Sequence, residues 1–157
     1  MRVEQEDDEM RIILDGMGGD NAPAAVVEGA VLAMKEMPHE IVFVGQEEVI
    51  REELKKYKYN EAQVSIVDAR EVISNDEAPV RAVRSKKDSS IVKGINMVKN
   101  GEGDIFISAG STGALLSGGL FILGRIQGID RPALACIYPI VGGRASLLVD
   151  AGANSEC

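Results

Sequence analysis

Two short loops of small residues carry the groups in this 157-residue chain that could bind an anion. The first is GMGGD at 16–20 and the second is GSTG at 110–113, and each follows a short apolar run. Glycine lets a backbone approach a ligand closely, and backbone N–H groups at a helix N-terminus attract negative charge. The chemistry that the two loops favour is therefore the binding of a phosphate-like anion by backbone N–H groups.

Each loop also has a purely structural interpretation. The first is a tight turn in which Asp20 or Asn21 caps the next helix, and in the second Ser111 is a plain N-cap. A dinucleotide fingerprint is disfavoured, because Asn21 stands where its last glycine belongs and no acidic residue closes the run at 40–45. The second loop lacks the lysine of a nucleoside triphosphate loop. Spacing alone leaves the turn and the anion site both open.

A basic segment, RAVRSKK at 81–87, supplies the local positive charge that an anionic ligand needs. Arg81 and Arg84 are three residues apart and share a face if the segment is helical. The planar guanidinium is suited to bidentate binding of phosphate. Ser89 and Ser90 follow at the start of the next predicted helix, where they can cap it or add to an anion site.

Side chains that act as bases or nucleophiles are scarce. The chain has one histidine, His39, between a predicted helix and a predicted strand, and two cysteines, Cys136 and Cys157. There is no zinc signature or paired-cysteine motif, and a Ser-His-Asp triad is disfavoured. We therefore expect no metal and no cofactor. Anion-binding groups without a protein nucleophile fit a reaction in which the bound anion is itself the nucleophile.

Composition and charge narrow the class of protein. The net charge of −8 disfavours nucleic acid as a partner, and a hydrophobic fraction of 45% is enough for a folded core. The acidic start, MRVEQEDDEM, lacks the apolar segment of a signal peptide. The most apolar run, 114–124, is too short to span a bilayer. Because two cysteines make no disulfide framework, we expect a reducing cytoplasm.

The pattern of apolar runs predicts an α/β fold with a mostly parallel, doubly wound sheet and helices on both faces. Residues 1–10 are expected to be an acidic flexible tail. The predicted strands are 11–15, 40–45, 64–69, 104–109, 133–141 and 146–152. The predicted helices are 24–37, 46–58, 90–101 and 111–127, the last of them buried, and the polar connection 70–90 has room for a short helix. Ligands bind such sheets at the carboxyl ends of the strands, which is where both glycine-rich loops fall.

Four segments closely resemble the PlsX family, the acyl-acyl-carrier-protein:phosphate acyltransferases of bacterial phospholipid synthesis. They are LDGMGGDNAP at 14–23, DEAPVRAVRSKKDSS at 76–90, ISAGSTGALLSGGLFILGRIQGIDRPAL at 107–134 and LLVDAGAN at 147–154. Their order and spacing match the family over residues 11–157. The chain departs from the family pattern in carrying Gly16 in place of alanine and Ser111 in place of asparagine, and it is shorter.

The resemblance implies a fold similar to phosphotransacetylase and the isocitrate and isopropylmalate dehydrogenases, incomplete here at the C-terminus. Residues 11–157 would be the N-terminal part of a longer acyltransferase domain. That enzyme makes acyl phosphate from long-chain acyl carrier protein and inorganic phosphate, and it is a cytoplasmic homodimer that associates peripherally with the membrane. The alternatives are an inactive binding or dimerisation module of the same enzyme and, less favoured, an NAD(P)-dependent dehydrogenase of the related fold.

We expect phosphate to lie between the two loops and Arg81 or Arg84. Arg81, Arg84 and Ser111 are the candidates for a direct catalytic role. The carrier protein is acidic, so Lys86, Lys87 and Arg125 are candidates for its docking patch. The full set of predicted binding residues is Asp15, Gly18, Gly19, Asp20, Arg81, Arg84, Ser89, Ser90, Gly110, Ser111, Thr112, Gly113 and Asn154.

Overall fold

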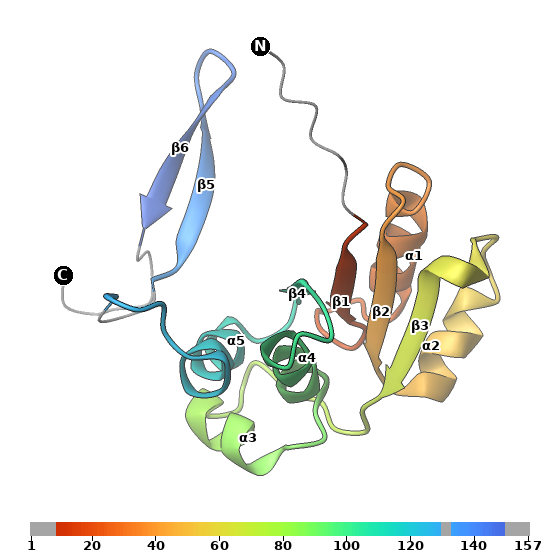
Figure 1. Ribbon diagram of the computed structural model, residues 1–157, viewed down its shortest axis with the longest axis horizontal. Coiled ribbons are helices and arrows are strands. Elements are labelled where there is room, and N and C mark those ends of the chain that lie inside the picture. Colours follow the sequence, from red (N-terminus) through yellow and green to blue (C-terminus); the bar gives the residue numbers. More distant parts are fainter. Residues whose placement is uncertain (1–8, 130–132, 150–157) are drawn as a thin grey trace. The chain divides into compact units, whose positions relative to one another are not determined.

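The structure is a computed structural model that describes residues 9–129 and 133–149. The chain divides between Leu123 and Gly124 into two compact units (Figure 1). The first unit carries both glycine-rich loops, and the second contains a β-hairpin. Each unit is described by itself below.

A four-stranded parallel sheet forms the centre of the first unit. Its strands are β1 (Arg11–Asp15), β2 (Glu40–Gly45), β3 (Val64–Asp68) and β4 (Ile105–Ile107). They lie in the order β3-β2-β1-β4, so the chain returns from one edge of the sheet to pair β4 with β1. Leu14 pairs with Phe43 on one side and with Ile107 on the other. The predicted bounds of the first two strands are confirmed, and β4 is shorter than expected.

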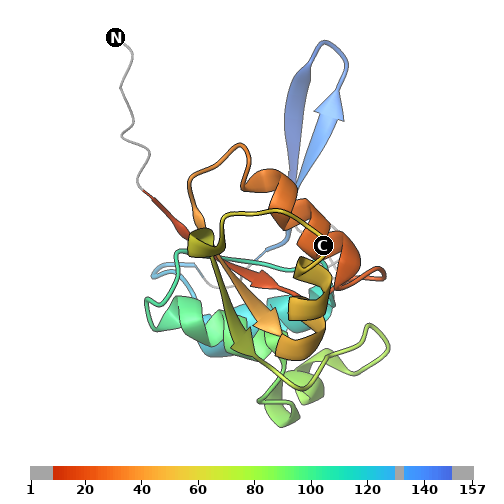
Figure 2. The ribbon, with the colours of Figure 1, turned by 90° about the vertical axis from the view of Figure 1, so that its right-hand side faces the viewer.

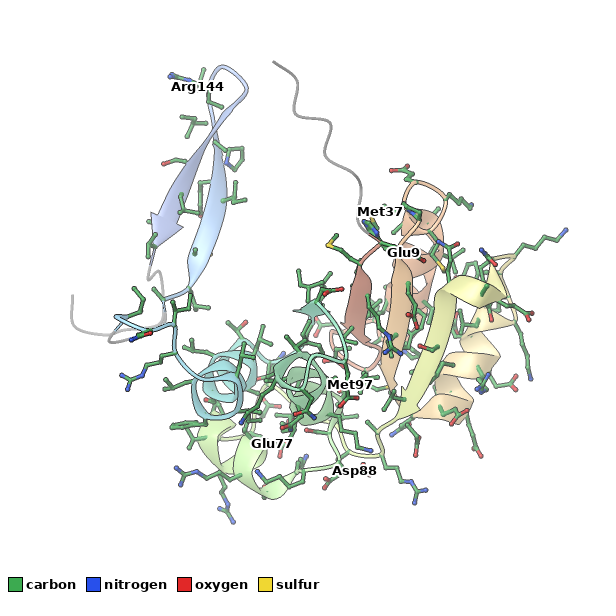
Figure 3. All side chains as sticks on the ribbon, viewed as in Figure 1. Glu9, Met37, Glu77, Asp88, Met97 and Arg144 are labelled. Atoms are coloured by element: carbon green, nitrogen blue, oxygen red, sulfur yellow. The ribbon has the colours of Figure 1, made fainter. Side chains whose placement is uncertain are left out.

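Helices cover both faces of this sheet (Figure 2). In β2 the side chains alternate: Ile41 and Phe43 join a core with α1 and α2, whereas Val42 and Val44 join one with Met97 of α4 (Figure 3). This alternation confirms the predicted doubly wound α/β architecture. The helices are α1 (Ala24–Ala33), α2 (Glu47–Leu54), the 3₁₀ turn η1 (Glu61–Gln63), α3 (Pro79–Ser85), α4 (Ser90–Lys99), α5 (Thr112–Gly118) and the π-helical η2 (Gly119–Leu123).

Three helices end well before their predicted ends, and one of them is α2, which ends at Leu54 rather than at 58. Helix α1 ends at Ala33 rather than at 37, and its N-cap residue is Pro23, so neither Asp20 nor Asn21 caps it. The helix predicted over 111–127 is α-helical only to Gly118 and then widens into η2. Phe121 in η2 is half exposed, so the expected burial fails there. The apolar composition of this stretch indicates that it can be buried. It does not indicate which element of the fold would cover it.

The second unit contains β5 (Ala135–Ile140) and β6 (Arg144–Val149), which pair antiparallel in a sheet of their own. The prediction that these two segments are strands is confirmed, but they pair with each other and do not join the parallel sheet. The connection is only 141–143, and Gly142 and Gly143 have φ of 90° and 70°. So short a connection permits only a hairpin, since parallel strands need a long crossover. Within 9–129 and 133–149, no helix has the length and apolar character needed to cross a membrane.

Helix α4 approaches the sheet unusually closely at Gly94. A Cβ atom at this position would lie 2.6 Å from Cδ2 of Phe106 in β4 and would also overlap the neighbouring ring carbon. The ring is held between the cores on the α4 side of the sheet. Glycine is therefore required here because the helix backbone packs directly on an aromatic ring.

The close packing predicts that Gly94→Ala lowers the free energy of unfolding by about 1–3 kcal/mol, the usual cost of overpacking a core. Gly29→Ala is the matched control, because Gly29 is also inside a ten-residue helix but a Cβ there meets nothing within 4 Å. The control is expected to gain up to about 1 kcal/mol from helix propensity. Urea unfolding of both variants measures the difference, and equal effects would contradict the close approach.

Candidate functional site

The loops after β1 and β4 leave the sheet toward opposite faces. The chain after β1 leads to α1, which packs on one face with α2. The chain after β4 leads to α5, whose Ala114 packs with α3 and α4 on the other face. The strand order reverses between these two neighbours, and open α/β sheets bind ligands at such a switch point. GMGGD and GSTG therefore meet where this fold opens a crevice.

The two loops are in direct contact. A Cβ atom on Gly18 would lie 2.8 Å from the backbone nitrogen of Gly110 and 2.5 Å from Oδ2 of Asp15, so no side chain fits there. Gly19 has a φ of +106°, which favours glycine, and it lies against Ala109. The structure thus brings together the residues of the two loops that the sequence singled out.

Asp15 lies at the base of the crevice and is only 1% exposed. One carboxylate oxygen accepts a hydrogen bond from the N–H of Met17 at 3.0 Å, and the other accepts from the hydroxyl of Ser108 at 2.7 Å. The same hydroxyl oxygen accepts from the N–H of Gly110 at 3.0 Å. Asp15 was predicted to bind phosphate, but in the structure both of its oxygens are bonded to the protein.

Ser108 is the functional residue that our sequence analysis missed. A signal for it exists, because Leu14 pairs with Ile107 and the next residues along the two parallel strands are Asp15 and Ser108. A serine that ends one apolar run beside an aspartate that ends another is typical of a bond across strand ends. The pairing of β1 with β4 must be known before that signal can be used.

Ser111 is the N-cap of α5, as the structural interpretation of the second loop predicted. Its hydroxyl oxygen accepts from the N–H of Ala114 at 3.3 Å, and the residue is buried. The N–H groups of Thr112 and Gly113 in the first turn have no partner within the helix. In the part of the chain that the structure describes, those of Gly18 and Gly19 donate to no protein acceptor either. The N–H groups of Asp20 and Ser111 have no protein acceptor among the described residues either, so backbone donors of both loops are left for a ligand.

The two arginines make no direct bond to the glycine-rich loops among the described residues, so their predicted contact with phosphate stays a prediction. Arg81 and Arg84 are both exposed on α3, and the Arg84 guanidinium lies 5.5 Å from the centre of the Phe121 ring. Between residues 9 and 129, neither makes a hydrogen bond or ion pair with loop residues. α3 nevertheless adjoins the site, because a Cβ on Gly113 would lie 2.6 Å from Cγ of Pro79.

The other predicted residues are spread around the unit. Ser89 caps α4 by accepting from the N–H of Val92 at 3.4 Å, Ser90 beside it is buried, and Asp20 is exposed.

The candidates for the docking patch are also described in part. Lys86 donates to Glu77 and to the carbonyl of Val72, each at 2.7 Å. Lys87 is exposed and donates to the carbonyl of Val83 at 3.1 Å. Arg125 belongs to the second unit, and Asn154 lies outside the described residues.

An apolar groove of about 540 Å³ adjoins the first loop. Small residues of α1 and side chains of β1 and β4 line most of it, whereas Asp15, Gly18 and Gly19 lie at its polar end. A groove of this kind suits a ligand with an apolar body and a polar head. His/Cys/Asp/Glu side chains of 9–129 and 133–149 form no group of three that could hold a metal ion.

A model of the family described as "Fatty acid synthesis protein" matches residues 10–157. The chain belongs to the fatty acid synthesis protein family. It is 49% identical over 148 residues to the phosphate acyltransferase of Clostridioides difficile and 54% identical over 148 residues to that of Clostridium kluyveri. Each comparison covers 94% of this chain but 44% of the relative, so the chain spans under half the length of these curated relatives.

A solved structure of a phosphotransacetylase from Streptococcus pyogenes has the same fold. The TM-score is 0.60 at 20% sequence identity, over 90% of this chain and 46% of that one. The similarity confirms the fold class predicted for this member of the fatty acid synthesis protein family.

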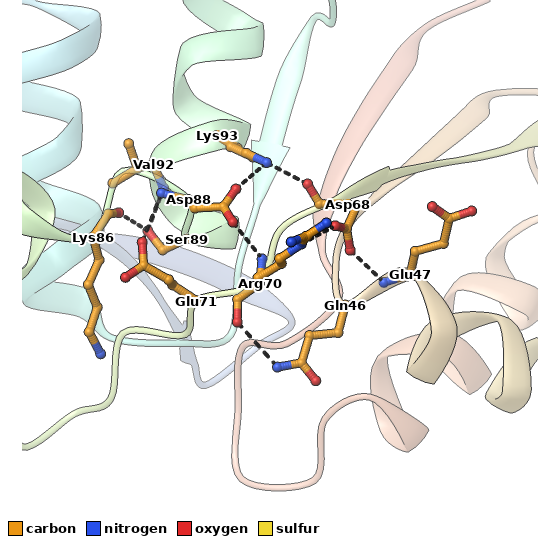
Figure 4. A network of polar contacts seen from close by, with 10 residues as sticks. All are labelled: Gln46, Glu47, Asp68, Arg70, Glu71, Lys86, Asp88, Ser89, Val92 and Lys93. Atoms are coloured by element: carbon orange, nitrogen blue, oxygen red, sulfur yellow. Dashed lines mark hydrogen bonds and ion pairs between the residues drawn. The ribbon is translucent and has the colours of Figure 1, made fainter.

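A network of charged side chains fixes the polar connection between β3 and α4 (Figure 4). Asp68 ends β3 and accepts from the N–H of Glu47 at 3.2 Å and from Nε of Arg70 at 3.1 Å. Asp88 accepts from the N–H of Arg70 at 3.3 Å and forms an ion pair with Lys93, which also donates to the Asp68 carbonyl at 2.6 Å. These bonds tie the start of α4 to the carboxyl end of the sheet.

The same bonds lower the pKa values of three carboxyl groups. The N–H of Glu47 is the main cause for Asp68, followed by Arg70. The hydrogen bond from Lys86 lowers the pKa of Glu77, and that from Lys93 lowers the pKa of Asp88. Each carboxylate is therefore favoured by the folded state over the unfolded chain.

The lowered pKa values predict that the protein loses stability in acid. The unfolded chain takes up protons near its ordinary carboxyl pKa values of about 3.9–4.3, before the folded state does. The free energy of unfolding should therefore fall as the pH drops from about 5 through the lower folded-state values. Urea unfolding from pH 7 to 3 measures this slope.

Asp88→Asn should make the slope shallower, because it removes one of the three groups. Asp76→Asn is the control, since Asp76 is exposed and forms no ion pair with any residue of 9–129. A slope in Asp88→Asn equal to that of the control would contradict the assignment.

Proposed function

We propose that this chain forms the phosphate-binding part of a phosphate acyltransferase. The reaction is transfer of a long-chain acyl group from acyl carrier protein to inorganic phosphate, which supplies acyl phosphate for phospholipid synthesis. The observation that carries the proposal is the meeting of two glycine-rich loops, with backbone donors that have no described protein acceptor, at the switch point of the sheet. The names of the relatives support it, although the chain covers only 44% of their length.

The chemistry needs an anion site rather than a protein nucleophile. A phosphate oxygen attacks the carbonyl carbon of the acyl thioester and forms a tetrahedral intermediate with a negatively charged oxygen. The C–S bond then breaks, the acyl phosphate forms, and the thiolate leaves and takes a proton from water. The protein's part is to hold phosphate at the carbonyl carbon and to stabilise the developing oxyanion.

The described residues suit both tasks. N–H groups of Gly18, Gly19, Thr112 and Gly113 can hold phosphate oxygens, and a small-residue surface allows close approach. The hydroxyl of Thr112 is exposed at the same helix end and can donate to an oxygen of the ligand. The apolar groove beside the first loop fits the chemistry of an acyl chain.

The partners follow from the same proposal. We propose acyl carrier protein as the acyl donor, a homodimer as the assembly, and a cytoplasmic enzyme that associates peripherally with the membrane. Because the chain carries a net charge of −8, an acidic carrier protein must dock on a local basic surface. Lys87 is the exposed lysine of the basic segment, whereas Lys86 is already paired with Glu77.

The direct test is release of thiol from palmitoyl acyl carrier protein as a function of phosphate concentration. We expect release that saturates with phosphate in a protein of the relatives' full length. The 157-residue chain is measured beside it, together with its binding of phosphate. Release by the short chain would show that it contains the chemistry, binding without release would indicate a binding module, and neither activity nor binding in either protein would contradict the proposal.

The predicted contact of Arg81 or Arg84 with phosphate can be tested separately. Arg81→Ala and Arg84→Ala should each raise the phosphate concentration at half-maximal rate by on the order of tenfold if a guanidinium contacts phosphate. Arg51→Ala is the control, because Arg51 is an exposed arginine on α2 that pairs with Glu47. An unchanged phosphate dependence in both α3 variants would show that backbone donors hold the anion without them.

A further inference from the structure

We infer that Asp15 and Ser108 form a clamp that positions the two glycine-rich loops, so that Asp15 is a positioning residue and not a phosphate ligand. The inference rests on the proposed function for its ligand but on described contacts for the clamp itself. Asp15 ends β1 and Ser108 follows β4, so the bond between them joins the starts of both loops.

Both Asp15 oxygens are already bonded to the protein, and burial leaves the carboxylate almost inaccessible to a ligand. One oxygen accepts from the N–H of Met17 and the other from the hydroxyl of Ser108, and 99% of the residue's surface is inaccessible. A carboxylate would also repel a phosphate anion at short range. The buried charge is compensated by these donors, which is the condition under which such a group is tolerated inside a protein.

Ser108 also holds the start of the second loop in place. Its hydroxyl hydrogen is donated to Asp15, so its oxygen is free to accept from the N–H of Gly110 at 3.0 Å. The N–H of Gly110 is therefore directed into the protein and is not a phosphate donor. In the same way, the first loop has its Met17 N–H turned toward Asp15. The donors that remain for a ligand begin at Gly18 in one loop and at Ser111 in the other.

The clamp limits the distance between these two sets of donors in both directions. The loops cannot move closer, because the backbone of Gly18 already touches that of Gly110. They cannot separate without breaking the bond at 2.7 Å between Ser108 and a buried carboxylate. The spacing of the N–H groups around phosphate is thus set by one side-chain pair.

Ser108→Ala is the principal test, because it breaks the clamp and leaves the charge of Asp15 in place. We expect the dissociation constant of inorganic phosphate, measured by titration calorimetry on the whole chain, to rise about tenfold. Ser65→Ala is the matched control: the Ser65 hydroxyl also donates to a carboxylate on the neighbouring strand, Glu40 at 3.1 Å, but at the amino end of the sheet. The control should bind phosphate like the unaltered chain at a similar loss of stability.

Variants of Asp15 separate positioning from charge. Asp15→Asn can still accept from Met17 and bond to Ser108, so we expect it to rescue most of the phosphate affinity that Asp15→Ala loses. Combining Asp15→Ala with Ser108→Ala should cost little more than either change alone, because both break one interaction. Full additivity, or unaltered phosphate binding in Ser108→Ala, would overturn the clamp.

Hydrogen exchange tests the clamp without phosphate. Asp15→Ala should speed exchange of the Gly110 amide, and Ser108→Ala should speed that of the Met17 amide, each in the loop that was not altered. Effects confined to the altered loop would contradict the clamp. If the unaltered chain binds no phosphate while these cross-loop effects occur, the proposed ligand is wrong and the clamp is right.

Discussion

The hydrogen bond between Ser108 and the buried carboxylate of Asp15 joins two strand ends that are 93 residues apart in the chain. The two glycine-rich loops that form the crevice begin on either side of this bond. The carboxylate is tolerated inside the protein because it accepts from the Met17 N–H of the first loop and from the hydroxyl of Ser108, just before the second loop. The residues above it are glycines because the two loops pass within contact distance of each other and leave no room for a larger side chain. One polar pair therefore explains both the composition of the loops and their placement.

The sheet makes this pair possible through its strand order. β1 has β2 on one side and β4 on the other, and the chain must complete α1, β2, α2, β3, α3 and α4 before β4 forms. The connection before α4 is held to the end of β3 by ion pairs and hydrogen bonds of Asp68, Asp88 and Lys93. The helix that covers β1 and β4 is thus anchored at its start by a charged network and along its length by apolar packing.

Local chemistry was enough to predict much of the first unit. Short apolar runs bounded by glycine or charge gave β1 and β2 with correct ends, and Ser89 and Ser111 are the caps that their positions favoured. Ser108 escaped prediction because its role depends on which strands are neighbours. The direction of Arg84 depends on the packing of α3 beside Phe121, and the pairing of β5 with β6 depends on a three-residue turn. The first two failures concern contacts that no local pattern encodes, whereas the hairpin follows from the short turn between its strands, which is a local signal.

The contact of Gly94 with Phe106 has a mechanical consequence. Most helices rest on a sheet through a layer of side chains that can change rotamer, but here backbone lies directly on a ring. Protein interiors have low compressibility, so this contact transmits displacement without absorbing it. α4 and β4 therefore have little freedom to slide past each other or to move apart in small steps at this contact.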